Sequence, residues 1–372
     1  MSKPVLKFCR MFAVLGVFVL AFGGMPQIFD GVEFTSSAFA QQKGGVPGDS
    51  IGNTSTSDMW RTIRRGNQGA VSLPDRNSGV MIQSEGDNWR AFRNGTMSNW
   101  GAWLLGGVLV LLLVYFLIRG RIKVDHGFSG RLIERFNNID RFAHWLTASS
   151  FVVLGLTGLN MLYGRYVIKP LIGGDAFSTI TMWGKYAHNF IGFAFMVGIV
   201  LILMLWVRDN MPNRHDLIWL SKAGGLFSKG VHPPARKFNA GQKILFWMVV
   251  ITGASISFSG LCLLFPFELS PFAGTFALLN VFGFDLPTNL TIMQEMQLSQ
   301  AWHGILSLIM IAVILAHIYI GWLGMEGAYD AMGTGYVDEN WARQHHNLWV
   351  EENEAKGGGD VTSGATSDKL DV

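Results

Sequence analysis

The sequence has few cysteines and few charged residues, and both shortages exclude classes of protein. Its 372 residues include two cysteines, Cys9 near the start and Cys262 inside an apolar segment. Two such cysteines cannot form a disulfide framework, a CxxC zinc site, an iron–sulfur cluster or a CxxCH haem attachment, so any metal must be bound through histidine. Charged residues make up 15% of the chain and hydrophobic residues 49%, which is typical of a membrane protein.

Five apolar segments dominate the rest of the chain. Each approaches or exceeds the roughly 20 apolar residues that a helix needs to cross a bilayer. They cover residues 100–118, about 142–163, 185–207, 243–265 and 300–324. The sequence therefore predicts an all-α integral membrane protein, with a four-helix transmembrane bundle over 142–324 and one extra N-terminal transmembrane helix over 100–118.

The basic residues of the loops predict an orientation. Loops 119–141 and 208–242 are rich in Lys and Arg, whereas loop 164–184 has two basic residues and loop 266–299 has none. By the positive-inside rule, the first two loops are cytoplasmic and the other two periplasmic. The same topology explains the net charge of +3 better than nucleic-acid binding does, and we expect no nucleic-acid partner. Residues 325–372 then form a cytoplasmic C-terminal tail, with a frayed, glycine- and serine-rich end.

The N-terminal region has the features of an exported segment. Three basic residues precede the short apolar run MFAVLGVFVLAFGG, and the AFA sequence ending at Ala40 matches a signal-peptide cleavage site. Residues 1–40 are therefore predicted to be a signal peptide, with an uncleaved anchor as the alternative. Residues 41–99 are polar and lack apolar periodicity, so we expect an irregular periplasmic extension or, with equal weight, a disordered linker.

Four histidines lie near the ends of three of the four apolar segments of the bundle, His144 in the first, His188 in the second, and two in the last. His303 and His317 share the last segment, and fourteen positions put them about 21 Å apart along a helix and within about 40° around it. His188 and His303 lie at the periplasmic level, whereas His144 and His317 lie at the cytoplasmic level. Ionisable groups inside a span usually face the bundle interior, so depth predicts the pairs His188/His303 and His144/His317.

These pairs favour haem over zinc. Zinc sites use three or four protein ligands, and no carboxylate or thiolate lies at these depths to complete such a set. Two axial imidazoles suit a haem, whose porphyrin supplies the other four nitrogens, so the sequence predicts two haems. Glycines near the ligands can let a macrocycle lie against the backbone, although close helix packing explains each of them equally well. These are Gly155, Gly158, Gly192, Gly198 and Gly304.

Five other histidines fall in hydrophilic segments predicted to be cytoplasmic. They are His126, His215, His232, His345 and His346. We expect a solvated or subunit-facing role for all of them, and for His345 and His346 the alternative is contact with a partner or proton uptake.

An ordered series of motifs accompanies these histidines. It consists of NIDRFAHW, KYAHNFIG, KFNAGQKILFW, QAWHG followed by AHIYI, and NWARQHH. Over about residues 131–350 this series resembles the γ subunit of respiratory formate dehydrogenases, a dihaem cytochrome b (b556). The resemblance assigns the haem iron ligands to His144, His188, His303 and His317, in agreement with the pairing by depth.

The resemblance also implies partners and a quinone site. In such enzymes an iron–sulfur β subunit and a molybdenum or tungsten catalytic α subunit lie in the periplasm, formate oxidation takes place in the α subunit, and the γ subunit passes electrons to quinone. The motif NAGQK implies a quinone contact through Asn239, with Gln242 as a weaker candidate. From the residues alone, Asn239 is equally a helix N-cap. Nothing in this chain indicates a pterin site.

The predicted protein is therefore a membrane cytochrome b in the bacterial inner membrane, carrying electrons inward from a periplasmic donor to quinone on the cytoplasmic side. One alternative is the same scaffold serving a hydrogenase or a thiosulfate or polysulfide reductase. Another is a haem-free membrane anchor or transporter. The resemblance says nothing about residues 41–118, and we expect the exported tail to contact the periplasmic subunits.

Overall fold

The computed structural model describes residues 86–355 and 362–363, so the predicted signal peptide and most of the predicted extension lie outside the described residues. Five described helices are long and apolar enough to cross a membrane. They are Asn88–Arg119, Asn138–Val167, Gly174–Trp206, Ala240–Leu264 and Ile292–Gly324. The predicted all-α, multi-pass fold with five spans is confirmed.

The first span begins earlier than the sequence predicts. Helix α3 (Gly86–Ala91), the π-helix η3 (Phe92–Met97) and helix α4 (Ser98–Arg119) follow one another without a break. The prediction of irregular structure up to residue 99 is wrong for residues 86–99. This polar stretch is held helical by tertiary contacts, because Arg93 donates to the carbonyl of Met161 and the buried Ser98 accepts from Tyr163.

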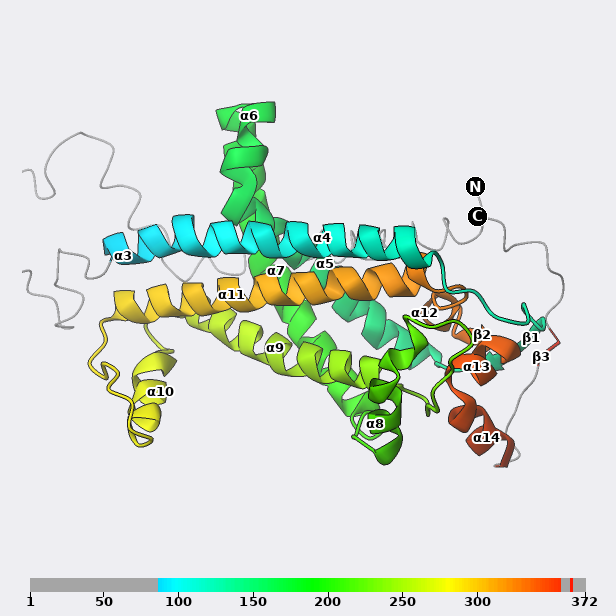
Figure 1. The fold of residues 1–372 in the computed structure, drawn as a ribbon. Helices are drawn as coiled ribbons and strands as arrows, with labels where there is room; N and C mark the ends of the chain where they lie inside the picture. The colour runs from blue at the N-terminus through cyan, green and yellow to red at the C-terminus, as the bar shows by residue number, and fades with distance from the viewer. Residues whose placement is uncertain (1–85, 356–361, 364–372) are drawn as a thin grey trace, which may run out of the picture. The chain divides into compact units, whose positions relative to one another are not determined.

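The four-helix bundle consists of α5 (Asn138–Val167), α7 (Gly174–Trp206), α9 (Ala240–Leu264) and α11 (Ile292–Tyr319), which continues as the π-helix η5 (Ile320–Gly324). Helix α5 packs along α7, α7 along α9, and α9 along α11, while α4 lies beside α11 (Figure 1). Capping boxes start α5 at Asn137, α9 at Asn239 and α11 at Thr291. In each box a side chain accepts from the first-turn backbone and fixes where the helix begins.

Short helices connect the spans. Helix α6 (Lys169–Ile172) joins α5 to α7, and α8 (Arg214–Ser221) with the 3-10 turn η4 (Ala223–Gly225) precedes α9. Helix α10 (Pro271–Asn280) lies before α11, in a segment predicted only to be a periplasmic loop. Its first turn is capped by the buried Glu295 of α11, whose carboxylate accepts from two backbone amides.

The segments around the bundle form a folded layer at one end, made of residues 120–137 and 325–355, which we call the end layer. Strand β1 (Arg131–Glu134) pairs antiparallel with β2 (Tyr336–Asp338) and β3 (Thr362–Ser363). Helices α12 (Asp330–Gly333), α13 (Glu339–His345) and α14 (Asn347–Ala355) complete it. Its side chains share one buried cluster with α5, α7 and α9. The part of the predicted tail up to Ala355 is thus packed structure, and most of the frayed end predicted beyond it lies outside the described residues.

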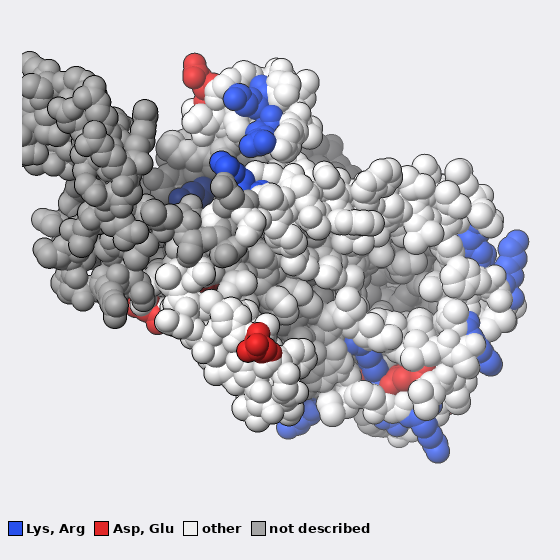
Figure 2. Space-filling model, turned by 60° about the vertical axis from the view of Figure 1, so that its left-hand side comes forward, with Lys and Arg blue, Asp and Glu red and all other residues white. Residues whose placement is uncertain are grey.

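The surface agrees with a membrane setting. Figure 2 shows a broad face almost without charged side chains, with lysines, arginines and acidic residues gathered at its borders. Many large apolar side chains are exposed along the spans, including Trp103 and Leu117 on α4 and Met204 on α7. In a multi-pass membrane protein such side chains face lipid, so their exposure needs no protein partner.

Candidate functional site

Two pairs of histidine rings face each other inside the bundle. His188 on α7 faces His303 on α11, with ring centroids 6.1 Å apart and ring planes inclined by 60°. His144 on α5 faces His317 on α11 at 6.3 Å and 62°. The structure therefore brings together the two pairs that the sequence predicts, and α11 contributes one member to each.

Hydrogen bonds determine which nitrogen is available in the His188/His303 pair. His303 Nδ1 lies 3.1 Å from the carbonyl oxygen of Ile256 and 3.0 Å from Ser259 Oγ. A carbonyl oxygen only accepts, so His303 Nδ1 carries the proton. His188 Nδ1 lies 2.9 Å from the hydroxyl oxygen of Thr157, which donates its own proton to a carbonyl one turn earlier in α5. Both rings consequently present an unprotonated Nε2, which is the tautomer that a metal requires.

The His144/His317 pair has a different environment. His144 Nδ1 is buried and has no hydrogen-bond partner among the described residues, while its ring packs edge-on against Trp145. The Trp145 indole nitrogen in turn donates to the carbonyl of Met332 in the end layer. His317 is by contrast an exposed residue of α11. This pair is therefore positioned by ring packing and by the end layer.

The spacing within each pair fits axial ligation of one iron. A metal–imidazole bond is about 2.0–2.1 Å long and each bound nitrogen lies about 1.1 Å from its ring centre, so two rings on opposite sides of a metal should have centroids about 6 Å apart. The observed values of 6.1 and 6.3 Å match this expectation. Within residues 86–355 and 362–363, no group of three or more His, Cys, Asp and Glu side chains could hold a metal ion. Two imidazoles per site leave the remaining coordination to a group such as a porphyrin.

The five glycines singled out in the sequence separate into two kinds. An added Cβ at Gly198 would lie 2.4 Å from a threonine oxygen on α5, and one at Gly304 would lie 2.9 Å from a methionine sulfur on η3. These two glycines serve close helix packing. At Gly158 and Gly155 the nearest atoms would be at 3.7 and 3.8 Å, and at Gly192 nothing lies within 4 Å. Gly192 follows His188 by one helical turn, so it leaves open space on the side of the bundle that the imidazole faces.

The predicted quinone residues occupy the start of α9. Asn239 is the N-cap: its Oδ1 accepts from the backbone nitrogen of Gln242 at 3.0 Å, and Gln242 Oε1 accepts from the Asn239 backbone nitrogen at 3.1 Å. The structure therefore shows Asn239 as the helix cap that the sequence predicts. The side-chain amide nitrogens are the groups left for a ligand, because the cap uses only the oxygens.

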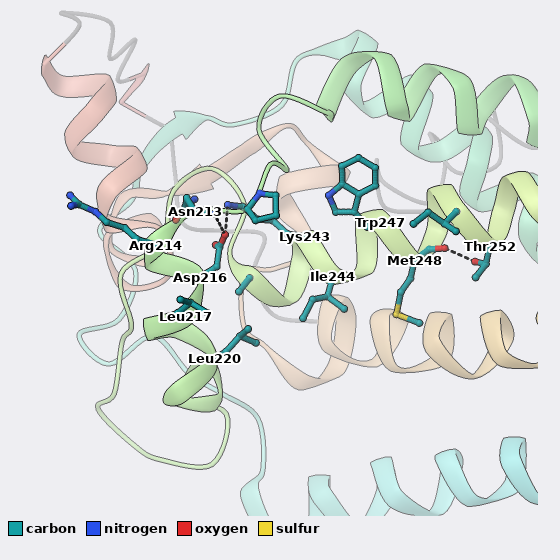
Figure 3. A pocket seen from close by; sticks show the side chains of 13 residues that line it. Asn213, Arg214, Asp216, Leu217, Leu220, Lys243, Ile244, Trp247, Met248 and Thr252 are labelled. Carbon is teal, nitrogen blue, oxygen red and sulfur yellow. Dashed lines mark hydrogen bonds and ion pairs between the residues drawn. The ribbon is translucent and has the colours of Figure 1, made fainter. Parts of the chain in front are cut away.

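A groove of about 700 Å³ lies beside the start of α9, between this helix and α8 (Figure 3). Its wall is mainly apolar, with an ion pair at one side in which Lys243 Nζ lies 3.0 Å from Asp216 Oδ2. At about 100° per residue, the lining residues of α9 centre on the side opposite Gln242. The groove therefore does not adjoin the predicted quinone residues, and the lysine of the NAGQK motif serves to join α8 to α9.

Two of the remaining histidines are less exposed than the sequence predicts. His346 is 1% exposed, and its Nδ1 lies 2.7 Å from the carbonyl oxygen of Arg236, so the expected solvated role is wrong for this residue. His345 packs against His232, whose Nε2 lies 2.7 Å from Asp125 Oδ2. Burial lowers the pKa of His345 to about 4, assisted by neighbouring positive groups. Both adjacent histidines are consequently neutral structural members of the end layer at pH 7.

A buried arginine in the end layer was not evident from the sequence. The Arg135 guanidinium is stacked near the rings of Phe136, Trp341 and Trp349, at 5.1–5.9 Å from their centroids. It donates to the carbonyl oxygen of Lys237 at 2.6 Å. Burial lowers the pKa of Arg135 to about 9, so it stays charged at neutral pH. Cation–π contacts of this kind hold the first loop, the α9 approach and the C-terminal helices together.

Residues 135–335 match the family model for prokaryotic cytochrome b561, and this segment covers just over half of the chain and includes all four paired histidines. The protein therefore belongs to the prokaryotic cytochrome b561 family, whose members bind haem b. The paired imidazoles lie within this segment and have the donor chemistry that a haem iron accepts.

Formate dehydrogenase subunits are among the similar proteins. The chain is 28% identical over 233 residues to the nitrate-inducible formate dehydrogenase cytochrome b556(Fdn) subunit of Escherichia coli, covering 61% of this chain and 96% of the relative. It is 26% identical over 220 residues to the formate dehydrogenase cytochrome b556(fdo) subunit of the same organism, covering 59% and 92%. A formate dehydrogenase cytochrome b556 subunit of Haemophilus influenzae is 21% identical over 233 residues, with 62% and 87% covered. The resemblance drawn from the motifs is confirmed.

Proposed function

We propose that this protein is the membrane cytochrome b subunit of a respiratory formate dehydrogenase, binding two b haems and passing electrons from a periplasmic iron–sulfur subunit to quinone on the cytoplasmic side of the inner membrane. The partners would be an iron–sulfur β subunit and a molybdenum or tungsten α subunit that oxidises formate. The relatives named above are all formate dehydrogenase cytochrome subunits. They favour a formate dehydrogenase over a hydrogenase or a thiosulfate or polysulfide reductase.

The observation that carries the proposal is the geometry of the four histidines. Two separate pairs, each with the ring spacing of axial ligands, share α11 at positions 303 and 317. Fourteen residues of helix correspond to about 21 Å, which is about two thirds of the roughly 30 Å thickness of the apolar core of a bilayer. One site then lies toward each membrane surface, and together they connect the two sides.

The residues of this chain have distinct tasks in the proposed protein. Thr157 and Ile256 hold the ligand protons at Nδ1 of the His188/His303 pair and leave Nε2 to bind iron. The haems supply one-electron redox chemistry. The side-chain amide of Asn239 is available to donate to a quinone oxygen, because the helix cap uses only its carbonyl. Electron transfer inward, coupled to proton uptake from the cytoplasm, would contribute to the membrane potential, at about 2.3 kcal/mol per charge per 100 mV.

The test uses the full-length protein, affinity-purified from membranes of its native host with any bound subunits. We expect reduced-minus-oxidised spectra with b-type bands that formate reduces, and co-purifying subunits that carry iron–sulfur clusters and molybdenum or tungsten. His303→Ala should remove one haem and His317→Ala the other, while His126→Ala, which alters an exposed histidine, should leave both. Absence of b-type bands, or bands unchanged in both ligand variants, would refute the haem assignment. Bands that hydrogen reduces and formate does not, or reduced bands that thiosulfate reoxidises and formate does not restore, would refute the formate donor.

A further inference from the structure

The extra helix α4 lies outside the family segment of residues 135–335, and the family therefore assigns it no role. It nevertheless packs along α11, which carries His303, and contacts the end of α5, whose Thr157 lies against His188. The contacts concentrate where η3 passes into α4. We call this set of residues the α4 junction: Met97, Ser98 and Gly101 from the N-terminal helix, Tyr163 from α5, and Gly304 and Leu308 from α11.

The α4 junction is tightly packed and buried. A Cβ added at Gly101 would lie 2.6 Å from both Leu308 Cδ1 and Tyr163 Oη, so the three helices meet at this glycine. A Cβ at Gly304 would lie 2.9 Å from Met97 Sδ. Contacts this short leave no space for even one added methyl group, and a larger side chain must push the helices apart.

Polar contacts fix the same junction in register. The Tyr163 hydroxyl donates to the carbonyl oxygen of Ser98 at 2.8 Å, and the Ser98 hydroxyl donates to the carbonyl oxygen of Arg93 at 2.6 Å. The second bond spans five residues, at the point where the π-helix η3 passes into α4. The junction thus ties α4 to α5 by a partly buried hydrogen bond and to α11 by side-chain packing.

Both partners of α4 hold the His188/His303 pair. Thr157, which contacts His188 Nδ1, precedes Tyr163 on α5 by six residues, and Gly304 directly follows His303 on α11. At about 100° per residue, the α11 residues that face α4 lie roughly 150° around the helix from its two histidines. Helix α4 therefore supports α11 from behind and does not line the space between the imidazoles.

We infer that the α4 junction is a positioning element of the His188/His303 site, setting the separation and tilt of α11, which carries His303, and of α5, whose Thr157 contacts His188, and through them the properties of the haem bound there. This inference rests on the proposed haem function. It gives the extra N-terminal span a role within the electron-transfer unit, distinct from membrane targeting or attachment of a partner.

The test compares two glycines of α4 in the full-length purified protein. Gly101→Val adds atoms inside the junction, whereas the matched control Gly106→Val adds the same atoms where nothing lies within 4 Å. The readouts are the electron paramagnetic resonance g-values of the oxidised haems and their midpoint potentials. Signals are assigned to the two sites with His188→Ala and His144→Ala.

We expect Gly101→Val to shift the g-values and potential of the haem at His188/His303 and to leave the other haem unchanged, and Gly106→Val to change neither. Tyr163→Phe removes the hydrogen bond to Ser98 without adding volume, and should cause a smaller shift in the same haem. If Gly101→Val prevents the protein from accumulating in the membrane, Tyr163→Phe alone decides the test. Wild-type values at both haems in these junction variants, or equal shifts at the two haems, would overturn the inference, whereas a wild-type protein without haem would refute the proposed function itself.

Discussion

Asn239 has two separable roles in the proposed protein, one as the helix cap seen in the structure and one as a quinone donor. Removing the cap in Asn239→Ala leaves the Gln242 backbone amide without its partner, whereas the reciprocal bond keeps its donor, the backbone nitrogen of residue 239. An N-cap loss costs about 1 kcal/mol, within a range of 0.5–2. For a domain of this size, that corresponds to a midpoint of thermal unfolding lower by roughly 2–4 °C.

Asn239→Ser separates the two roles, because serine caps helices about as well as asparagine but has no amide. We expect this variant to keep the thermal midpoint and to lose one hydrogen bond to quinone, about 1–1.5 kcal/mol, which is roughly a five- to tenfold drop in kcat/KM for quinone reduction. Thr291→Ala removes an equivalent capping box from α11 and is the matched control for stability, with quinone turnover unchanged. Full turnover in Asn239→Ser would show that the residue is only a cap.

Three further predictions follow from the same contacts. Thr157→Val removes the acceptor of the His188 Nδ1 proton, so it should raise the midpoint potential of the haem at His188/His303 and weaken binding of that haem about 10- to 100-fold. The control Thr252→Val should change neither property. Redox titration measures the potential, and haem retention measures the binding. Gly192→Leu fills the open space beside His188 and should lower the haem content from two toward one; a content of two would mean that the glycine faces lipid. The pKa of His345 falls from about 6.5 when exposed to about 4 when buried beside His232 and Arg135, with Asp125 as its acidic neighbour. As pH falls, His345 takes up a proton in the opened end layer before it does so in the folded layer, so the layer should lose stability between pH 6.5 and 4. The loss is measured as lower hydrogen-exchange protection factors in α13, corrected for the intrinsic rate at each pH, and His345→Gln should reduce it.

The sequence was most informative where a polar residue interrupted an apolar segment. A histidine in a span is costly, so its presence alone indicated the interior of the bundle, and helical geometry was enough to predict the pairing found in the structure. Asn239 was readable as a cap for a similar reason, since an asparagine before an apolar run has few other local uses.

Contacts between distant segments could not be predicted in this way. The composition of residues 86–99 is polar, and only packing against α5 and α11 makes them helical. Likewise, Arg135 reads as one more positive-inside charge, whereas its burial depends on aromatic rings contributed more than 200 residues later by α13 and α14. His346 belongs to the same layer, so its burial was hidden for the same reason. Local sequence carries the period of a helix but not the identity of its neighbours.

Helix α11 shows why the apolar periodicity of a segment does not reveal which neighbour each side of the helix packs against. Its histidines point to α5 and α7, Met310 and the residues near it contact α9, and Gly304, Leu308 and Tyr319 face α4. A helix that is in contact on several sides needs no polar stripe and is apolar all round, as this one is from Ala301 onward apart from its two histidines and Ser307. The ligands are consequently the only residues of the segment that mark one side, and the glycine and tyrosine positions opposite them acquire meaning only when α4 is known to lie there. If α4 positions this helix as we infer, the residues that tune the His188/His303 site include positions with no chemical resemblance to a ligand, on the face turned away from it.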